Sequence, residues 1–223
     1  MARSNLLEAV QVLEQGSMAL MYRPRVQEQA REGSEEVQRL LLLLTPAGSP
    51  FERLIVIGRK RLARSAKRDR FWGFVDLVLT PEDMQAALAA QTYGTATRGS
   101  RHLPAARPLA EGAYEVEVHH SHAHLRWHAE RVPGDPLASH MEMEKHADYI
   151  ITVANPDVAA WGLDEPPDLQ GQLFDDVELH VPLPAPLPSA LQQRFRGRRF
   201  AQLESIDWLD HPGTELVFVG SGD

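Results

Sequence analysis

The chain of 223 residues contains no cysteine. This absence excludes disulfide bonds, a thiol nucleophile, zinc sites built on thiolates and iron–sulfur clusters held by cysteine. The chemistry left to the side chains is that of histidine, carboxylates and hydroxyl groups. A chain without cysteine also fits a reducing compartment, and we therefore expect a cytoplasmic location.

Long apolar runs are missing as well. The longest, residues 40–44, is far shorter than the roughly 20 residues that cross a bilayer. Near the N-terminus Glu8, Gln11 and Glu14 interrupt the apolar residues, so no signal-peptide core is present. We expect neither export nor a membrane partner.

The sequence also lacks the local signatures of several enzyme classes. It has no glycine-rich phosphate loop, no dinucleotide-binding fingerprint, no nucleophile elbow around a serine and no zinc-protease helix motif. The residues therefore identify no catalytic group, and they leave open whether the protein is an enzyme.

Charge is unevenly distributed around a net value of −8, which disfavours a general nucleic-acid-binding role. Residues 53–70 hold eight basic side chains against Asp69 alone, whereas residues 157–188 hold seven acids and no Lys or Arg. An arginine-rich segment suits phosphate or carboxylate binding. The alternative is a solvated connection that the acidic loop neutralises. The candidate anion-binding residues are Arg59, Lys60, Arg61, Arg64 and Arg68.

Hydrophobic periodicity and turn residues predict an α+β fold, with a mixed, largely antiparallel sheet and a few flanking helices. Residues 94–112 and 157–188 are rich in turn residues and are predicted as loops. The predicted helices are residues 5–16, a helix that starts at Pro81, and residues 189–196. The predicted strands are residues 17–26, 37–45, 53–57, 71–79, 149–154 and 215–219, and residues 114–130 are one long strand or a hairpin.

We expect residues 1–223 to form one compact unit with an internal seam at 94–112. The seam separates halves 1–93 and 113–223. Basic residues after Gly58 and after Gly197 are each followed by an apolar strand. This echo leaves an ancient duplication of two related halves as an open alternative.

Histidine is concentrated in residues 119–124, with His128 close behind. On a single strand, alternation would place His120, His122 and His124 on one face and His119 on the other. Two imidazoles at i and i+2 could then reach one divalent metal ion, with Glu130 and His146 among further ligands. The alternatives are a solvated histidine-rich strand and a pH-sensing surface. The candidate metal ligands are His120, His122, His124, His140 and Glu144.

Five short segments spread along most of the chain resemble a family of uncharacterised bacterial proteins of similar length. The resemblance implies a bacterial cytoplasmic protein and carries no activity, cofactor or catalytic residue. The segments are Tyr22-Arg-Pro-Arg-Val, Val37-Gln-Arg-Leu, Gly58-Arg-Lys-Arg-Leu, Phe71-Trp-Gly-Phe-Val-Asp and Pro104-Ala-Ala-Arg-Pro.

The leading functional hypothesis is a non-enzymatic binding or regulatory protein that acts on a protein partner in the cytoplasm. A second is a metal-binding protein or metal-dependent enzyme that uses His120, His122 and His124, with a divalent metal as its cofactor. A third is a binder of phosphate or RNA through residues 59–70.

Overall fold

We analysed a computed structural model, which describes residues 10–24, 37–58, 64–95, 99–119, 122–132, 143–158 and 187–222. Its helical elements are α1 (Pro81–Leu88), α4 (Ser189–Arg194) and the 3₁₀ turns η2 (Ser65–Lys67) and η3 (Ile206–Trp208). Its strands are β1 (Gln11–Pro24), β2 (Val37–Pro46), β3 (Glu52–Ile57), β4 (Arg70–Leu79), β5 (Gln91–Thr95), β6 (Gly99–Leu103), β7 (Arg107–His119), β8 (His122–Arg131), β9 (His146–Ala154), β10 (Phe200–Gln202) and β11 (Glu215–Gly220).

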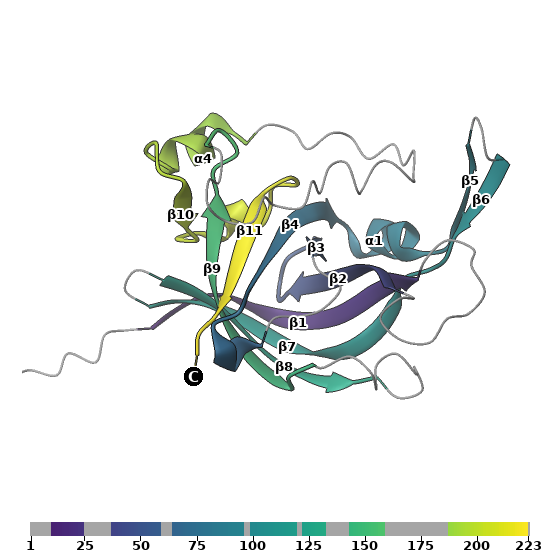
Figure 1. Ribbon diagram of the computed structural model, residues 1–223, viewed down its shortest axis with the longest axis horizontal. Coiled ribbons are helices and arrows are strands. Elements are labelled where there is room, and N and C mark those ends of the chain that lie inside the picture. Colours follow the sequence, from purple (N-terminus) through teal and green to yellow (C-terminus); the bar gives the residue numbers. More distant parts are fainter. Residues whose placement is uncertain are drawn as a thin grey trace, which may run out of the picture.

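Eight of the strands form a closed antiparallel barrel (Figure 1). The order around the barrel is β9-β11-β4-β3-β2-β1-β7-β8, and pairing of β8 with β9 closes the ring. Each half of the barrel is a four-stranded meander, β1-β2-β3-β4 and β7-β8-β9-β11. Strand β10 adds to β9 outside the ring, and β5 and β6 form a separate hairpin that projects from it.

Inward-facing side chains fill the barrel, as expected for a ring of eight strands. Every second residue of β8 and β9 is buried, which is the alternation that a strand with one buried face requires. Strand β3 is buried on both faces from Arg53 to Ile57. The two meanders share one hydrophobic core, to which both halves of the chain contribute. Its largest fully buried side chains are Trp208, Tyr22, Tyr149, Phe71, Phe195 and Phe218.

Two inward-facing glycines allow the sheet to bend sharply. A side chain on Gly16 of β1 would overlap the carbonyl oxygen of Thr45 on β2, and one on Gly112 of β7 would overlap the carbonyl oxygen of His128 on β8. Glycine at such positions permits a close approach between neighbouring backbones. Both bends lie beside the row of strands that carries the candidate site below.

Helix α1 covers part of the outer surface of the barrel. Thr80 caps its N-terminus by accepting a hydrogen bond from the backbone N–H of Asp83. Met84 packs on a small apolar cluster that includes Leu54 and Val56 of β3. Arg23 of β1 donates hydrogen bonds to carbonyl groups at the end of α1 and before β7, which anchors this layer to the sheet.

An ionic network in the barrel interior links the two meanders to residues 187–214. The guanidinium group of Arg53 on β3 donates to both carboxylate oxygens of Glu14 on β1 and, over 2.8 Å, to Asp210. The hydroxyl of Tyr114 on β7 donates to the same Glu14 carboxylate over 2.6 Å. Arg53 is only 3% exposed, so Glu14 depends on it for charge compensation.

The predicted α+β class is wrong, because the fold is a β-barrel with two α-helices among the described residues. The predicted helix at residues 5–16 is wrong where the structure describes it, since Gln11 to Tyr22 pair with β7 and this tertiary pairing overrides the local helical pattern. The predicted loop at 94–112 contains β6 and the start of β7. The proposed seam therefore falls at the passage from the β5–β6 hairpin into the second meander. Within the described ranges, no helix combines the length and apolar character that a bilayer crossing demands.

Removal of the Arg53 side chain tests how much the interior ionic network contributes to the free energy of unfolding. Arg53→Ala should lower the free energy of unfolding by about 3–5 kcal/mol, because it leaves the Glu14 carboxylate buried without its cation. The matched control is Arg194→Ala, which removes an exposed ion pair with Asp207 and should cost less than about 1 kcal/mol. Urea denaturation followed by circular dichroism measures both values. Equal losses in the two variants would show that Arg53 is not a structural anchor.

Candidate functional site

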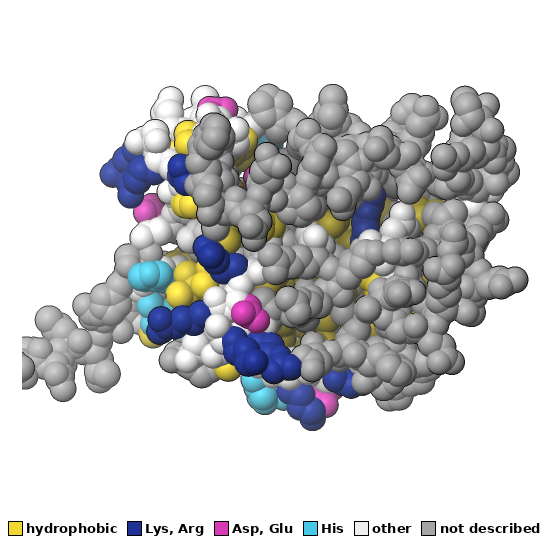
Figure 2. All heavy atoms as spheres, viewed as in Figure 1, with side chains coloured by type: hydrophobic (Ala, Val, Ile, Leu, Met, Phe, Trp, Pro, Cys, Tyr) yellow, Lys and Arg dark blue, Asp and Glu magenta, His cyan; other side chains and the backbone are white. Residues whose placement is uncertain are grey.

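The outer face of β7, β8 and β9 carries the described histidines that the sequence analysis singled out: His119, His122, His124, His128 and His146. Strands β7 and β8 pair antiparallel as a hairpin, in which His119 lies opposite His122. Along β8, alanine, leucine and tryptophan face inward, and histidine and arginine face outward. In Figure 2, histidine side chains gather at the hairpin end and again near the lower end of β8.

Arg126 is the centre of an ionic ladder across this face. Its guanidinium group donates to Glu117 on β7 and, over 2.9 Å, to Asp148 on β9. The other oxygen of Asp148 lies 2.7 Å from Nδ1 of His124. The ladder thus joins three strands through charge-assisted hydrogen bonds, which are among the stronger polar contacts in proteins.

The hairpin changes the predicted arrangement of the histidines. His119 does not face away from His124, because the turn reverses the chain and brings both rings to the outer face, with centroids 5.1 Å apart. Nε2 of His119 lies 3.0 Å from the Glu117 carboxylate. The single-strand alternation is therefore wrong for His119, and the hairpin interpretation is confirmed.

The predicted metal ligands do not converge where the structure describes them. His120 and His140 lie outside the described residues, and His122 is exposed at the hairpin. Glu144 accepts hydrogen bonds from the backbone N–H and hydroxyl of Ser65, at 2.9 and 2.6 Å, and so holds η2 against the barrel. Nowhere in the described ranges do three or more metal-ligating side chains come together.

A different histidine pair is formed between β8 and β9. His128 and His146 lie directly opposite each other in register, and their ring centroids are 4.4 Å apart. Nδ1 of His128 lies 3.2 Å from Nδ1 and 3.3 Å from Nε2 of His146. Glu130 follows on the same face, where Lys145 holds its carboxylate at 2.9 Å and keeps the pKa of that carboxyl below its usual value.

A cavity of about 670 Å³ opens along this region, within the usual range for a small-molecule site. It follows the row of residues where β1, β7, β8 and β9 lie side by side, and Ser65 of η2 borders it. Its aromatic lining comes from Tyr114 and Trp127. Its ionisable lining consists of Glu115, Arg126, His128, His146 and Asp148.

Around the cavity, the carboxylates of Glu115, Glu117 and Asp148 outnumber the single guanidinium group of Arg126, and the imidazoles of His128 and His146 also line it. Arg126 faces the carboxylates of Glu117 and Asp148 and lies close to that of Glu115. The pKa of Glu115 is raised by partial burial and by the neighbouring Glu117 carboxylate, although Arg126 opposes the shift. One cation thus serves several carboxylates, so the surface favours a further positive charge.

The predicted anion-binding segment is described only in part. Arg59, Lys60 and Arg61 lie outside the described residues. Arg64 and Arg68 are exposed at the two ends of η2, and Arg68 adopts a left-handed backbone conformation with φ of 53°. The described part of the segment thus presents positive charge beside β4 without forming a pocket of its own.

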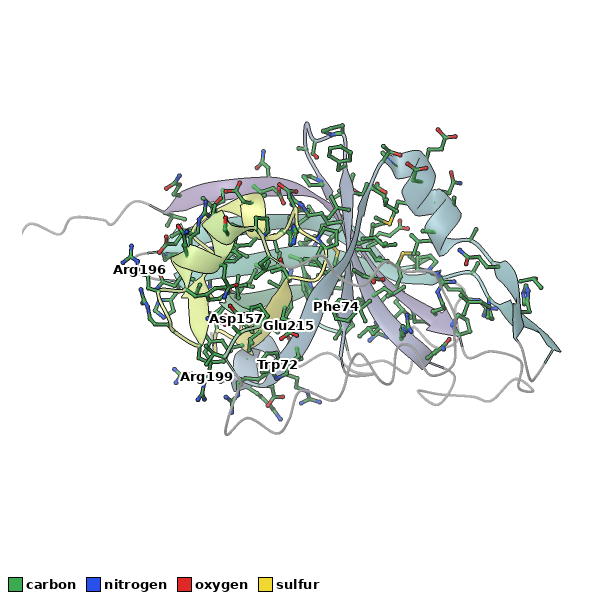
Figure 3. All side chains as sticks on the ribbon, turned by 90° about the horizontal axis from the view of Figure 1, so that it is seen from above. Trp72, Phe74, Asp157, Arg196, Arg199 and Glu215 are labelled. Carbon is green, nitrogen blue, oxygen red and sulfur yellow. The ribbon has the colours of Figure 1, made fainter. Side chains whose placement is uncertain are left out.

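A second surface lies on the outer side of β4 and β11. Glu215 is opposite Phe74 in register, and Figure 3 shows it close to Trp72 and Phe74, on the side where Asp157 and Arg199 also lie. The side-chain carboxylate of Glu215 makes no hydrogen bond or ion pair with the described residues, and burial raises the pKa of this carboxyl. This face is mostly apolar, with Trp72 packed beside Val217.

Sequence analysis did not single out several residues of the candidate site, among them Glu115, Glu117, Arg126, Asp148 and Ser65. Strand alternation alone would have placed Arg126 outward beside His124 and His128. No local signal places Asp148 and His146 beside β8, because that pairing depends on barrel closure.

Comparison of the chain with protein-family models, with curated proteins and with solved structures finds no match.

Neutralising Glu215 tests whether the partly buried charge of this carboxylate lowers the stability of the fold. Because burial raises its folded pKa above the ordinary value of 4.5, the charged carboxylate destabilises the fold once the pH exceeds that folded pKa. Glu215→Gln should raise the melting temperature at pH 7 by roughly 2–4 °C, the change that about 1 kcal/mol produces in a domain of this size. The gain should vanish below about pH 4, where glutamate is protonated in both states.

The control for that measurement is Glu111→Gln, which changes an exposed acid on the outer face of β7. Differential scanning fluorimetry across pH 3.5–8 measures both variants. A loss of stability in Glu215→Gln at pH 7, with Glu111→Gln unchanged, would mean that the charged carboxylate has a stabilising partner.

Proposed function

We propose that this protein is a non-enzymatic binding protein, and that its ligand is a small organic cation held in the cavity bordered by β1, β7, β8, β9 and η2. The ligand class is an alkyl amine or a guanidinium compound. The observation that carries the proposal is the excess of carboxylates around this cavity, with Arg126 as their shared cation.

The size and rigidity of the cavity support a small molecule. Its volume suits a ligand rather than a single water molecule. Its lining residues lie on paired strands, which hold side chains more firmly than loops do. Tyr114 and Trp127 also border the cavity, with their side chains in the barrel core, while Glu115, Arg126 and Asp148 supply charge from the outer face.

Electrostatics favour a cation over an anion. An anionic ligand would have to compete with Glu117 and Asp148 for Arg126, and it would approach Glu115 as a like charge. A cationic ligand would instead add a second positive charge to the carboxylates, and it would relieve the repulsion between Glu115 and Glu117. This distinction separates the proposal from the phosphate-binding hypothesis.

Calorimetric titration of the full chain at low salt tests this function, with agmatine and 1,4-diaminobutane as probes. We expect both cations to bind and Glu115→Gln to weaken the binding at least tenfold, because that carboxylate lines the cavity. Glu111→Gln, a change on the same outer face of β7 but away from the lining, should leave the affinity unchanged.

One neutral and one anionic compound of similar length serve as negative controls. Neither 1,4-butanediol nor succinate should bind measurably, since they lack the positive charge. Stronger binding of succinate than of the amines, or no amine binding by the folded wild-type chain, would contradict the proposed function.

A further inference from the structure

We infer that His128 and His146 form a binding site for one divalent transition-metal ion, which does not use the His120, His122 and His124 cluster. The site needs no organic ligand in the cavity, so it stands independently of the proposed function. It uses two neighbouring strands and faces outward at the edge of the cavity.

The spacing of the two rings fits a shared ion. Two imidazole nitrogens that each lie about 2.0–2.1 Å from one tetrahedral ion are about 3.3 Å apart. The ring nitrogens of His128 and His146 are already 3.2–3.3 Å apart. A neutral imidazole is the form that binds a metal.

The backbone keeps the two histidines together without help from a metal. They are opposed in the antiparallel register of β8 and β9, where side chains on one face lie about 5 Å apart at Cβ. The following backbone hydrogen bond, from the N–H of Ala129 to the carbonyl of Lys145, extends the same pairing. Little ordering of the chain is therefore needed when the ion binds.

The ligand type selects the metal. Two imidazoles suit zinc, nickel, copper or cobalt, whereas magnesium and calcium prefer oxygen ligands. Glu130 lies 3.9 Å from Nε2 of His128 and adds negative charge near the site. Since no third ligand joins the pair among the described residues, the ion keeps open positions for water and binds less tightly than in a four-ligand structural site.

Zinc titration of the untagged, chelator-treated full chain tests the site by calorimetry at pH 7.5. We expect one ion per chain, no detectable binding of magnesium, and at least tenfold weaker zinc binding in both His128→Gln and His146→Gln. Both side chains are exposed, so the variants should fold, and circular dichroism confirms this. At pH 5.5 the wild-type affinity should fall because protons compete for the imidazoles.

His122→Gln is the matched control, because His122 lies exposed on the same face of the same strand. It should retain wild-type zinc affinity, and so should Glu115→Gln, which separates this test from that of the organic cation. The site is refuted if zinc binds equally well to the His128 and His146 variants, if His122→Gln alone loses it, or if the wild-type chain binds none.

Discussion

The pairing of β8 with β9 closes the barrel, and the other features of the molecule depend on it. Strand β9 also pairs with β11 and, at its end, with β10, so it joins the second meander to the ring and carries residues 187–214 beside it. Closure leaves no unpaired edge between these strands. It also brings His146 and Asp148 next to β8, which assembles the ionic ladder and the histidine pair.

Because side chains fill the barrel interior, the candidate binding residues lie on its outer surface. The barrel is packed with aliphatic and aromatic side chains, and in the interior Arg53 is paired with Glu14 and Asp210. Charged groups that the interior cannot accommodate lie instead on β7, β8 and β9, where water and the ladder contacts offset their desolvation. The proposed organic-cation cavity and the inferred metal pair both lie on this surface.

Local sequence patterns predicted much of the strand content but not the architecture. The strands at residues 37–45, 53–57 and 71–79 were found because their apolar runs and β-branched residues carry a local signal, and Thr80 with Pro81 correctly marked the start of α1. The helix predicted at residues 5–16 is wrong from Gln11 onward. Over so short a stretch, the apolar spacing does not separate a helical period of about 3.6 residues from a strand period of two, and pairing with β7 favours the strand.

The candidate site could be predicted only in outline. The histidine-rich segment marked the face on which the candidate site lies, yet the partner of His128 lies 18 residues away and its position depends on barrel closure. The most direct test of the account is a heteronuclear NMR titration of the full chain with agmatine. We predict chemical-shift changes concentrated at Glu115, Arg126, His128, His146 and Asp148, on the strands that border the cavity. Changes confined to the outer side of β4 and β11, or no change on a folded chain, would contradict it.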